Sequence, residues 1–172
     1  MKFLENDNIR LRAVEPADAE LLWEAENDSR QWLDNGMSAP LSRQNLKNYA
    51  ENYDADPIRS GQLRMICENK NGKMVGIVDL YDISAIGRTA FVGIYLFEKY
   101  RRNGYSAECL SLLESYARML LNLRILGAKI SETNTNSIHL FENSGYELRG
   151  TLPDWLLAGT KSKALYIYTK TL

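Results

Sequence analysis

Residues 91–119, FVGIYLFEKYRRNGYSAECLSLLESYARM, decide the fold of this chain. They begin with a run of aromatic and β-branched residues, 91–97, which suits a β-strand. They continue into a stretch whose apolar residues recur at helical spacing and mark one apolar helix face: Ala107, Leu110, Leu113, Ala117, Leu120 and Leu121. The sequence therefore predicts a strand, a short basic turn and a long amphipathic helix.

The turn between this strand and this helix, residues 100–106, suits a phosphorylated ligand. A helix N-terminus carries unpaired backbone N–H groups and the positive end of the helix dipole. Gly104 lets the backbone take a positive φ and approach a ligand closely, and Arg101 and Arg102 add positive charge. We therefore expect an anion site at this turn. An ordinary strand-to-helix loop is the alternative, because Asn103-Gly104 is also a common turn signal.

The composition predicts one ordinary globular domain. With 172 residues, of which 45% are hydrophobic, we expect a single domain spanning 1–172. The formal net charge of −1 gives no reason to expect nucleic acid or an anionic membrane as a partner. The N-terminal stretch lacks an apolar segment of signal-peptide length. The sequence has no run of 18 consecutive apolar residues, so no membrane span is expected. A cytoplasmic protein is expected.

The cysteines and the histidine give no indication of a metal site. Cys67 and Cys109 lie far apart and outside any CxxC pattern, so we expect two reduced, buried thiols. His139 is the only histidine. No bound metal is expected.

The stretches on either side of residues 91–119 predict a mixed sheet. Helices are expected at 15–29, 42–53, 105–121 and 136–143, and strands at 9–14, 62–69, 74–83, 90–97, 124–133, 146–151 and 164–169. Hairpin connections make the run from 62 to 97 antiparallel, whereas the strand–helix–strand passage that follows predicts a parallel pair. The expected fold class is α/β (α+β), with a mixed, mostly antiparallel central sheet and helices on both faces. Gly104 would then lie at the carboxyl end of a strand, where α/β sheets bind ligands.

Three blocks of this sequence resemble the GCN5-related N-acetyltransferases over nearly the full length: IRLRAVEPADAE, GIYLFEKYRRNGYSAECLSLLESYA and ISETNTNSIHLFENSGYELRG. The likeness is strongest to the branch of ribosomal-protein N-terminal acetyltransferases and spermidine N-acetyltransferases. The family's Gln/Arg-x-x-Gly-x-Gly/Ala loop stands here as Arg101-x-x-Gly104-x-Ser106. Its later pattern stands here as Asn134, Ser137, Phe141 and Gly145-Tyr146.

The resemblance implies an acetyl-CoA-dependent acyltransferase of the GNAT type. Backbone amides of the turn would hold the CoA pyrophosphate, the strand before it would pair with the pantetheine arm, and Asn134 would lie near the thioester. An N-cap role for Asn134 is compatible with this assignment. The cofactor-binding residues so implied are Ile94, Tyr95, Leu96, Arg101, Arg102, Asn103, Gly104, Tyr105, Ser106, Asn134 and Phe141.

The sequence departs from the family at two positions that bear on mechanism. Phe141 stands where many members have the tyrosine that protonates the leaving thiolate, and a phenyl ring cannot donate that proton. Phe91 follows Ala90 where many members have a glutamate. The catalytic residues that the resemblance then implies are Ser137 near the sulfur, Asp154 as a base, and Asn134. A solvated turn aspartate is the alternative for Asp154.

The loss of the usual acid and base bears on which amine we expect as the acceptor. Deprotonating an alkyl amine of pKa about 10.4 costs roughly 4 to 5 kcal/mol at pH 7, whereas an α-amine of pKa about 7.7 to 8.0 costs about 1 kcal/mol. A site poor in acids and bases thus favours a peptide or amino-acid α-amine. A polyamine or aminoglycoside is the alternative, although residues 29–41 offer only Asp34 as an acid. Asp79 and Asp82 are other carboxylates expected to face a cleft.

The expected reaction is direct attack of the amine on the acetyl group in a ternary complex. Backbone N–H groups near Tyr95 and Leu96 would polarise the thioester oxygen. A CoA-binding protein without turnover and a plain phosphate-binding module remain alternatives from the sequence. Because several family members pair, a homodimer is also kept open.

Overall fold

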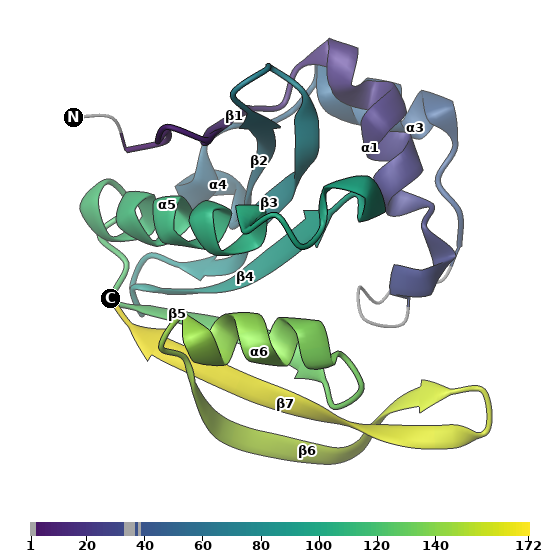
Figure 1. Ribbon diagram of the computed structural model, residues 1–172, viewed down its shortest axis with the longest axis vertical. Helices are drawn as coiled ribbons and strands as arrows, with labels where there is room; N and C mark the ends of the chain where they lie inside the picture. The colour runs from purple at the N-terminus through teal and green to yellow at the C-terminus, as the bar shows by residue number, and fades with distance from the viewer. Residues whose placement is uncertain (1–2, 33–36, 38) are drawn as a thin grey trace.

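The computed structural model describes residues 3–32, 37 and 39–172, and these form a seven-stranded sheet (Figure 1). The strands follow one another in the order β1 (Ile9–Ala13), β2 (Leu63–Asn69), β3 (Met74–Ser84), β4 (Thr89–Leu96), β5 (Ile125–Ser131), β7 (Lys161–Thr171) and β6 (Glu147–Ala158). Only the β4–β5 pair is parallel among these described strands. The predicted mixed, mostly antiparallel sheet is confirmed.

Helices cover both faces of the sheet, as predicted. On one face, α5 (Tyr105–Met119) and α6 (Thr135–Asn143) bury side chains against the larger apolar core. On the other face, α1 (Ala19–Glu26) and α3 (Arg43–Glu51) pack over β2 and β3, where Leu22 and Leu46 meet Ile66. Each helix turns its apolar stripe to the sheet, because that removes the most apolar surface from water.

The first half of the chain is more broken into short helices than the sequence predicted. The expected helix at 15–29 divides into the 3-10 helix η1 (Pro16–Asp18), α1 and the 3-10 helix η2 (Ser29–Gln31). The loop expected before β2 contains a short helix, α4 (Pro57–Ser60). Asp56 explains it, because its carboxylate accepts hydrogen bonds from the N–H groups of Ile58 and Arg59 and caps the turn.

The hairpin of β6 and β7 is much longer than predicted, and it projects from the body of the molecule (Figure 1). The sequence predicted residues 146–151 as the beginning of the first strand and indicated no strand beyond them. The structure instead continues pairing to Ala158, with a register shift between Leu152 and Leu156. A bulge on this edge strand absorbs Pro153 and the positive φ of Asp154, 53°.

Strands β4 and β5 separate after a short paired segment. Their pairing runs from Thr89–Ile125 to Phe91–Gly127, whereas β4 continues to Leu96 and β5 to Ser131. A 3-10 turn, η3 (Glu98–Tyr100), then leads from β4 to the start of α5. The separation of the two strands opens the sheet at its centre, directly before the turn that the sequence singled out.

The two cysteines lie as predicted. Cys67 and Cys109 are both fully buried free thiols. Within the described ranges, no helix has the length and apolar character needed to cross a membrane.

Candidate active-site cleft

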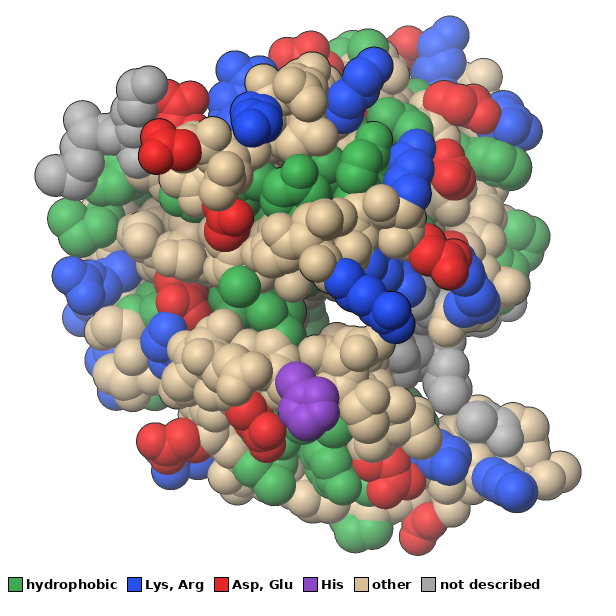
Figure 2. Space-filling view, in the orientation of Figure 1, with side chains coloured by type: hydrophobic (Ala, Val, Ile, Leu, Met, Phe, Trp, Pro, Cys, Tyr) green, Lys and Arg blue, Asp and Glu red, His purple; other side chains and the backbone are tan. Residues whose placement is uncertain are grey.

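A cleft of about 1480 Å³ occupies the place where β4 and β5 separate. Its walls come from β4, the turn before α5, the start of α6, and β3 with α1. Figure 2 shows the hollow, with lysine and arginine side chains on one rim and the histidine, His139, on another. The elements that the resemblance implied for a cofactor thus surround one space.

The turn before α5 has the backbone shape of an anion site. Gly104 is the N-cap of the helix with φ of 79°, and Arg102 also has a positive φ, 64°. A β-carbon added at Gly104 would find no atom within 4 Å, so the approach to the helix N-terminus is open. Arg101 Nε donates to the carbonyl oxygen of Leu96 at 3.0 Å and holds the turn against β4. The residues present therefore fit a diphosphate.

The side chains of this turn divide into two groups. Arg101, Arg102 and Ser106 line the cleft. Asn103 instead donates from Nδ2 to backbone oxygens within the turn, of Tyr100 at 3.3 Å and Arg101 at 3.2 Å. Asn103, Gly104 and Tyr105 are not among the cleft-lining residues.

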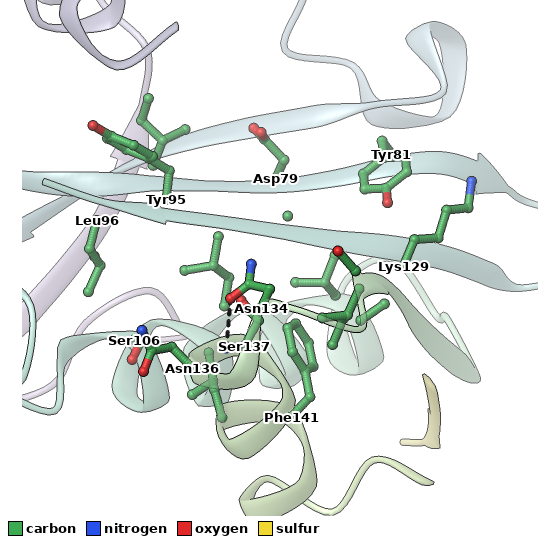
Figure 3. Close-up of a pocket in the computed structure, with 18 of the residues that line it drawn as sticks. Asp79, Tyr81, Tyr95, Leu96, Ser106, Lys129, Asn134, Asn136, Ser137 and Phe141 are labelled. Carbon is green, nitrogen blue, oxygen red and sulfur yellow. Dashed lines mark hydrogen bonds between the residues drawn. The ribbon is translucent and has the colours of Figure 1, made fainter. Parts of the chain in front are cut away.

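The start of α6 faces β4 across the cleft (Figure 3). Asn134 is the N-cap of this helix, and its Oδ1 accepts a hydrogen bond from the Ser137 N–H at 3.2 Å. Phe141 lines the cleft one turn later, 4% exposed, with its ring edge-on to Tyr146 at 4.8 Å between centroids. The N-cap role expected for Asn134 is confirmed, and its side chain still lies at the cleft.

The β4 wall presents alternate residues to opposite faces of the sheet. Ile94 packs against the larger core with α5, whereas Tyr95 packs against the smaller core with α1 and α3. Tyr95 meets Phe97 edge-on at 5.4 Å, and burial raises the pKa of its phenol. Ile94, Tyr95 and Leu96 all line the cleft, so the strand, the turn and α6 meet there as the resemblance implied.

An ion-pair network that the sequence did not predict forms the other half of the cleft. Arg64 donates from Nε and Nη2 to the two oxygens of Asp79 at 2.8 and 2.9 Å, and from Nη1 to Glu26. Burial opposes the charged form of Arg64, but the Asp79 and Glu26 carboxylates outweigh it and raise its pKa. Two carboxylates around one guanidinium leave a net negative charge at this wall.

Gly93 leaves room beside this network. It pairs with Asp79 across β3 and β4. A β-carbon there would lie 3.5 Å from Asp79 Cβ, 3.7 Å from its Oδ2 and 4.0 Å from the ring of Tyr81. These are ordinary contact distances, so the missing side chain leaves a small space that opens onto a carboxylate. Asp79 was expected to face a cleft, and this is confirmed. Asp82 was expected to face it too, but it is not among the cleft-lining residues and pairs instead with Lys129, which is. No sequence signal pointed to Arg64 or Glu26.

Asp154 lies apart from these groups. It is exposed on β6, accepts a hydrogen bond from the hydroxyl of Ser162, and is not among the cleft-lining residues, whereas its neighbour Trp155 is. The alternative, a solvated aspartate, fits this exposure, although the residue lies within a bulged strand and not in a turn. Its role as a base stays a prediction that this position does not support. Asp34 lies outside the described residues, and among those described no cluster of His, Cys, Asp and Glu could hold a metal.

Comparisons with known proteins agree on one family. The model of the acetyltransferase (GNAT) domain matches residues 8–147. A spermidine N(1)-acetyltransferase of Vibrio cholerae is 22% identical over 86% of this chain and 83% of its own length, and one of Escherichia coli is 24% identical over 84% and 76%. A putative ribosomal N-acetyltransferase of Bacillus subtilis is 25% identical over 95% and 91%.

Solved structures give the same fold. The spermidine N-acetyltransferase of Vibrio cholerae, in complex with CoA and spermine, superposes with a TM-score of 0.84 at 20% identity, covering 96% of each chain.

Proposed function

Because this chain belongs to the GNAT acetyltransferase family, it is an acetyl-CoA-dependent N-acetyltransferase, and we propose that it acetylates a primary amine of a linear polyamine. The observation that carries the proposal is the negatively charged wall beside Gly93, where Asp79 and Glu26 outnumber Arg64. Such a wall attracts a cationic amine to the centre of the cleft.

Acetyl-CoA supplies the acetyl group as a thioester. The backbone N–H groups of the turn before α5 would hold its diphosphate, with Arg101 and Arg102 adding charge. The free edge of β4 would pair with the extended arm, and N–H groups near Tyr95 and Leu96 would polarise the carbonyl. Asn134 and Ser137 on α6 close the opposite side.

The acceptor amine would bind between Gly93 and Asp79 and attack the acetyl group directly. Asp79 is held on both oxygens by Arg64, so it keeps one orientation while its remaining lone pairs accept from an ammonium. The amine must lose a proton before attack, and this carboxylate is the acid–base group placed to assist. Tyr49, Tyr81 and Trp155 also line the cleft, and their rings suit methylene and ammonium groups.

This proposal replaces the earlier preference for a peptide or amino-acid α-amine. That preference assumed a site poor in acids and bases, and the wall formed by Glu26, Arg64 and Asp79 removes the assumption. The curated relatives named above as spermidine acetyltransferases support the polyamine as well. The α-amine stays as a second candidate, because Phe141 leaves the thiolate without the usual acid and a less basic amine reacts more readily.

The direct test is release of thiol from acetyl-CoA by the purified protein. Spermidine, spermine and putrescine are compared with free amino acids and with peptides bearing different N-terminal residues. We expect release with the polyamines at a kcat/KM at least tenfold above that for any α-amine. Release with peptides or amino acids alone would overturn the polyamine assignment and establish the second candidate. Binding of CoA without release for any amine would overturn both.

Self-association is part of the same proposal. β6 is an edge strand, and Leu148, Trp155 and Leu157 on it are 49%, 63% and 67% exposed. A long edge strand with apolar side chains favours pairing with another chain. A spermidine N-acetyltransferase of Vibrio cholerae has been solved as a dodecamer, which supports a second copy of this chain as the partner. Light scattering of the purified protein checks this, and a monomer at all concentrations would contradict it.

A further inference from the structure

A lysine from β5 lies in the acceptor half of the cleft with its ammonium already bound. Lys129 Nζ lies 4.3 Å from the ring centroid of Phe91, 5.4 Å from that of Tyr81, and 3.1 Å from Asp82 Oδ2. Figure 3 shows it beside Tyr81, at the end of the cleft beyond Asp79. Two aromatic faces and a carboxylate are the groups that recognise an alkylammonium ion.

The two rings that hold this ammonium are fixed by the sheet. The rings of Tyr81 and Phe91 stack at 5.7 Å with an angle of 24°, and the two residues pair across β3 and β4. Phe91 lies directly over Gly127 of β5, where an added β-carbon would come within 2.7 Å of the ring. Burial, with the charges of Asp82 and Asp79, raises the pKa of Tyr81 to about 12, so its ring stays a neutral phenol.

The side chain of Lys129 is held less firmly than the rings of Tyr81 and Phe91. Lys129 stands on a flexible four-carbon stem with its side chain 36% exposed, and Asp82 is 62% exposed. An exposed ion pair contributes little, about 0–1 kcal/mol. The ammonium of Lys129 can therefore leave while the rings stay in place.

The spacing to Asp79 suits a diamine. Asp79 and Tyr81 are two residues apart on β3 and point to the same face of the sheet. Two residues of a strand span about 7 Å, which an amine with a three- or four-carbon spacer can reach. One nitrogen would then lie at Asp79 and the next at the rings of Tyr81 and Phe91.

We infer that Tyr81, Asp82 and Phe91 form a subsite for a second ammonium group of the acceptor, and that Lys129 is a specificity-determining residue because its own ammonium competes for that subsite. The inference rests on the proposed function, and it names how the acceptor is chosen. A polyamine must displace Lys129 to bind, whereas a monoamine at Asp79 has no such competitor. The lysine therefore weakens the preference for polyamines over monoamines.

The test compares Lys129→Met, which keeps a flexible side chain and removes the charge, with Lys129→Arg, which keeps the charge. The readout is the ratio of kcat/KM for putrescine to kcat/KM for butylamine, with acetyl-CoA saturating. We expect Lys129→Met to raise this ratio about fivefold through KM, the factor that follows when an exposed cation–π contact and an exposed ion pair no longer have to be broken. Lys129→Arg should stay close to the wild-type ratio.

Lys47→Met is the matched control, because Lys47 is an exposed, ion-paired lysine outside the cleft, 3.9 Å from Glu51. It should leave the ratio at the wild-type value. A ratio that falls or does not change in Lys129→Met would overturn the inference.

A calorimetric titration of putrescine separates this result from the proposed function. If no alkylamine is acetylated, the proposed function fails, but tighter putrescine binding to Lys129→Met than to the wild type would still support the subsite. Equal binding to both proteins would overturn it.

Discussion

The two halves of the cleft are built in different ways. The half at the start of α5 uses backbone: a turn with two positive φ angles, a helix N-terminus and a free strand edge. The half beside Gly93 uses side chains from three separate elements, Glu26 of α1, Arg64 of β2 and Asp79 of β3. Backbone recognition suits a group common to all family members, whereas side-chain recognition can change with the acceptor.

The comparison explains why mutations in the two halves should separate cleanly. Changes at the turn should alter the affinity for acetyl-CoA with any acceptor. Changes at the ion-pair network should alter acceptor kinetics and leave the affinity for acetyl-CoA intact.

The largest effect is expected from Gly104→Val. A β-branched side chain disfavours the φ of 79° and projects into the open approach to the helix N-terminus. The dissociation constant of acetyl-CoA should rise at least about a hundredfold, the loss expected when two charge-assisted hydrogen bonds of about 1.5–3 kcal/mol each are removed. Calorimetry measures it.

Gly72→Val is the matched control for the turn. Gly72 has a φ of 69° and no atom within 4 Å of an added β-carbon, but it lies in the turn between β2 and β3. It should lose similar stability, about 1–2 kcal/mol, with unchanged affinity for acetyl-CoA. Unchanged affinity in Gly104→Val itself would show that the turn does not hold the diphosphate.

The next largest effect is expected from Asp79→Asn, which keeps the shape of the side chain and removes its charge. The kcat/KM for spermidine should fall about 10- to 100-fold, because one hydrogen bond to a charged group contributes about 1.5–3 kcal/mol. Affinity for acetyl-CoA should not change. Asp54→Asn is the control, because Asp54 makes the same two-point contact with Arg59 outside the cleft. An equal loss of kcat/KM in both variants would show that Asp79 only stabilises the fold.

A smaller gain is expected from Phe141→Tyr, which restores a hydroxyl at the cleft wall between α6 and β4. If protonation of the thiolate limits turnover, kcat should rise by up to about tenfold. The gain stays below the usual 10²–10⁴ for a general acid because a thiol of pKa about 8.5 departs tolerably as its anion. Steady-state assays measure kcat for both proteins. An unchanged kcat would mean that another step governs the rate.

The smallest effect concerns pH. The pKa of Tyr81 is raised to about 12 by burial, then by the charges of Asp82 and Asp79. A raised pKa keeps the phenol protonated to about pH 11, so its ionisation adds nothing to the pH dependence below that. The rise of kcat/KM with pH should follow the pKa of the acceptor amine and shift when the amine is changed. A midpoint that disappears in Tyr81→Phe would contradict this.

The backbone half of the cleft could be predicted from the sequence better than the side-chain half. The turn, its glycine and the helix that follows are contiguous, so local patterns contain them all, and Asn134 and Ser137 belong to a second short pattern. Arg64, by contrast, meets Glu26 at a separation of 38 residues. Two strands and a helix must pack before the network of these residues with Asp79 exists, and nothing local indicates it.

The errors have physical causes of the same kind. The resemblance implied Asp154 as a base near the reacting groups, but a bulge in β6 places it on the exposed hairpin while Trp155 lines the cleft. The helix α4 was missed because four residues give too short a period, and only the capping by Asp56 signals it.

A crystal structure of the protein with acetyl-CoA and spermidine tests the central claim most directly. The account predicts the diphosphate on the backbone N–H groups of residues 103–106, the thioester between β4 and Ser137, and the acceptor nitrogen between Gly93 and Asp79. A nucleotide bound elsewhere, with the turn before α5 making no contact to it, would contradict the account.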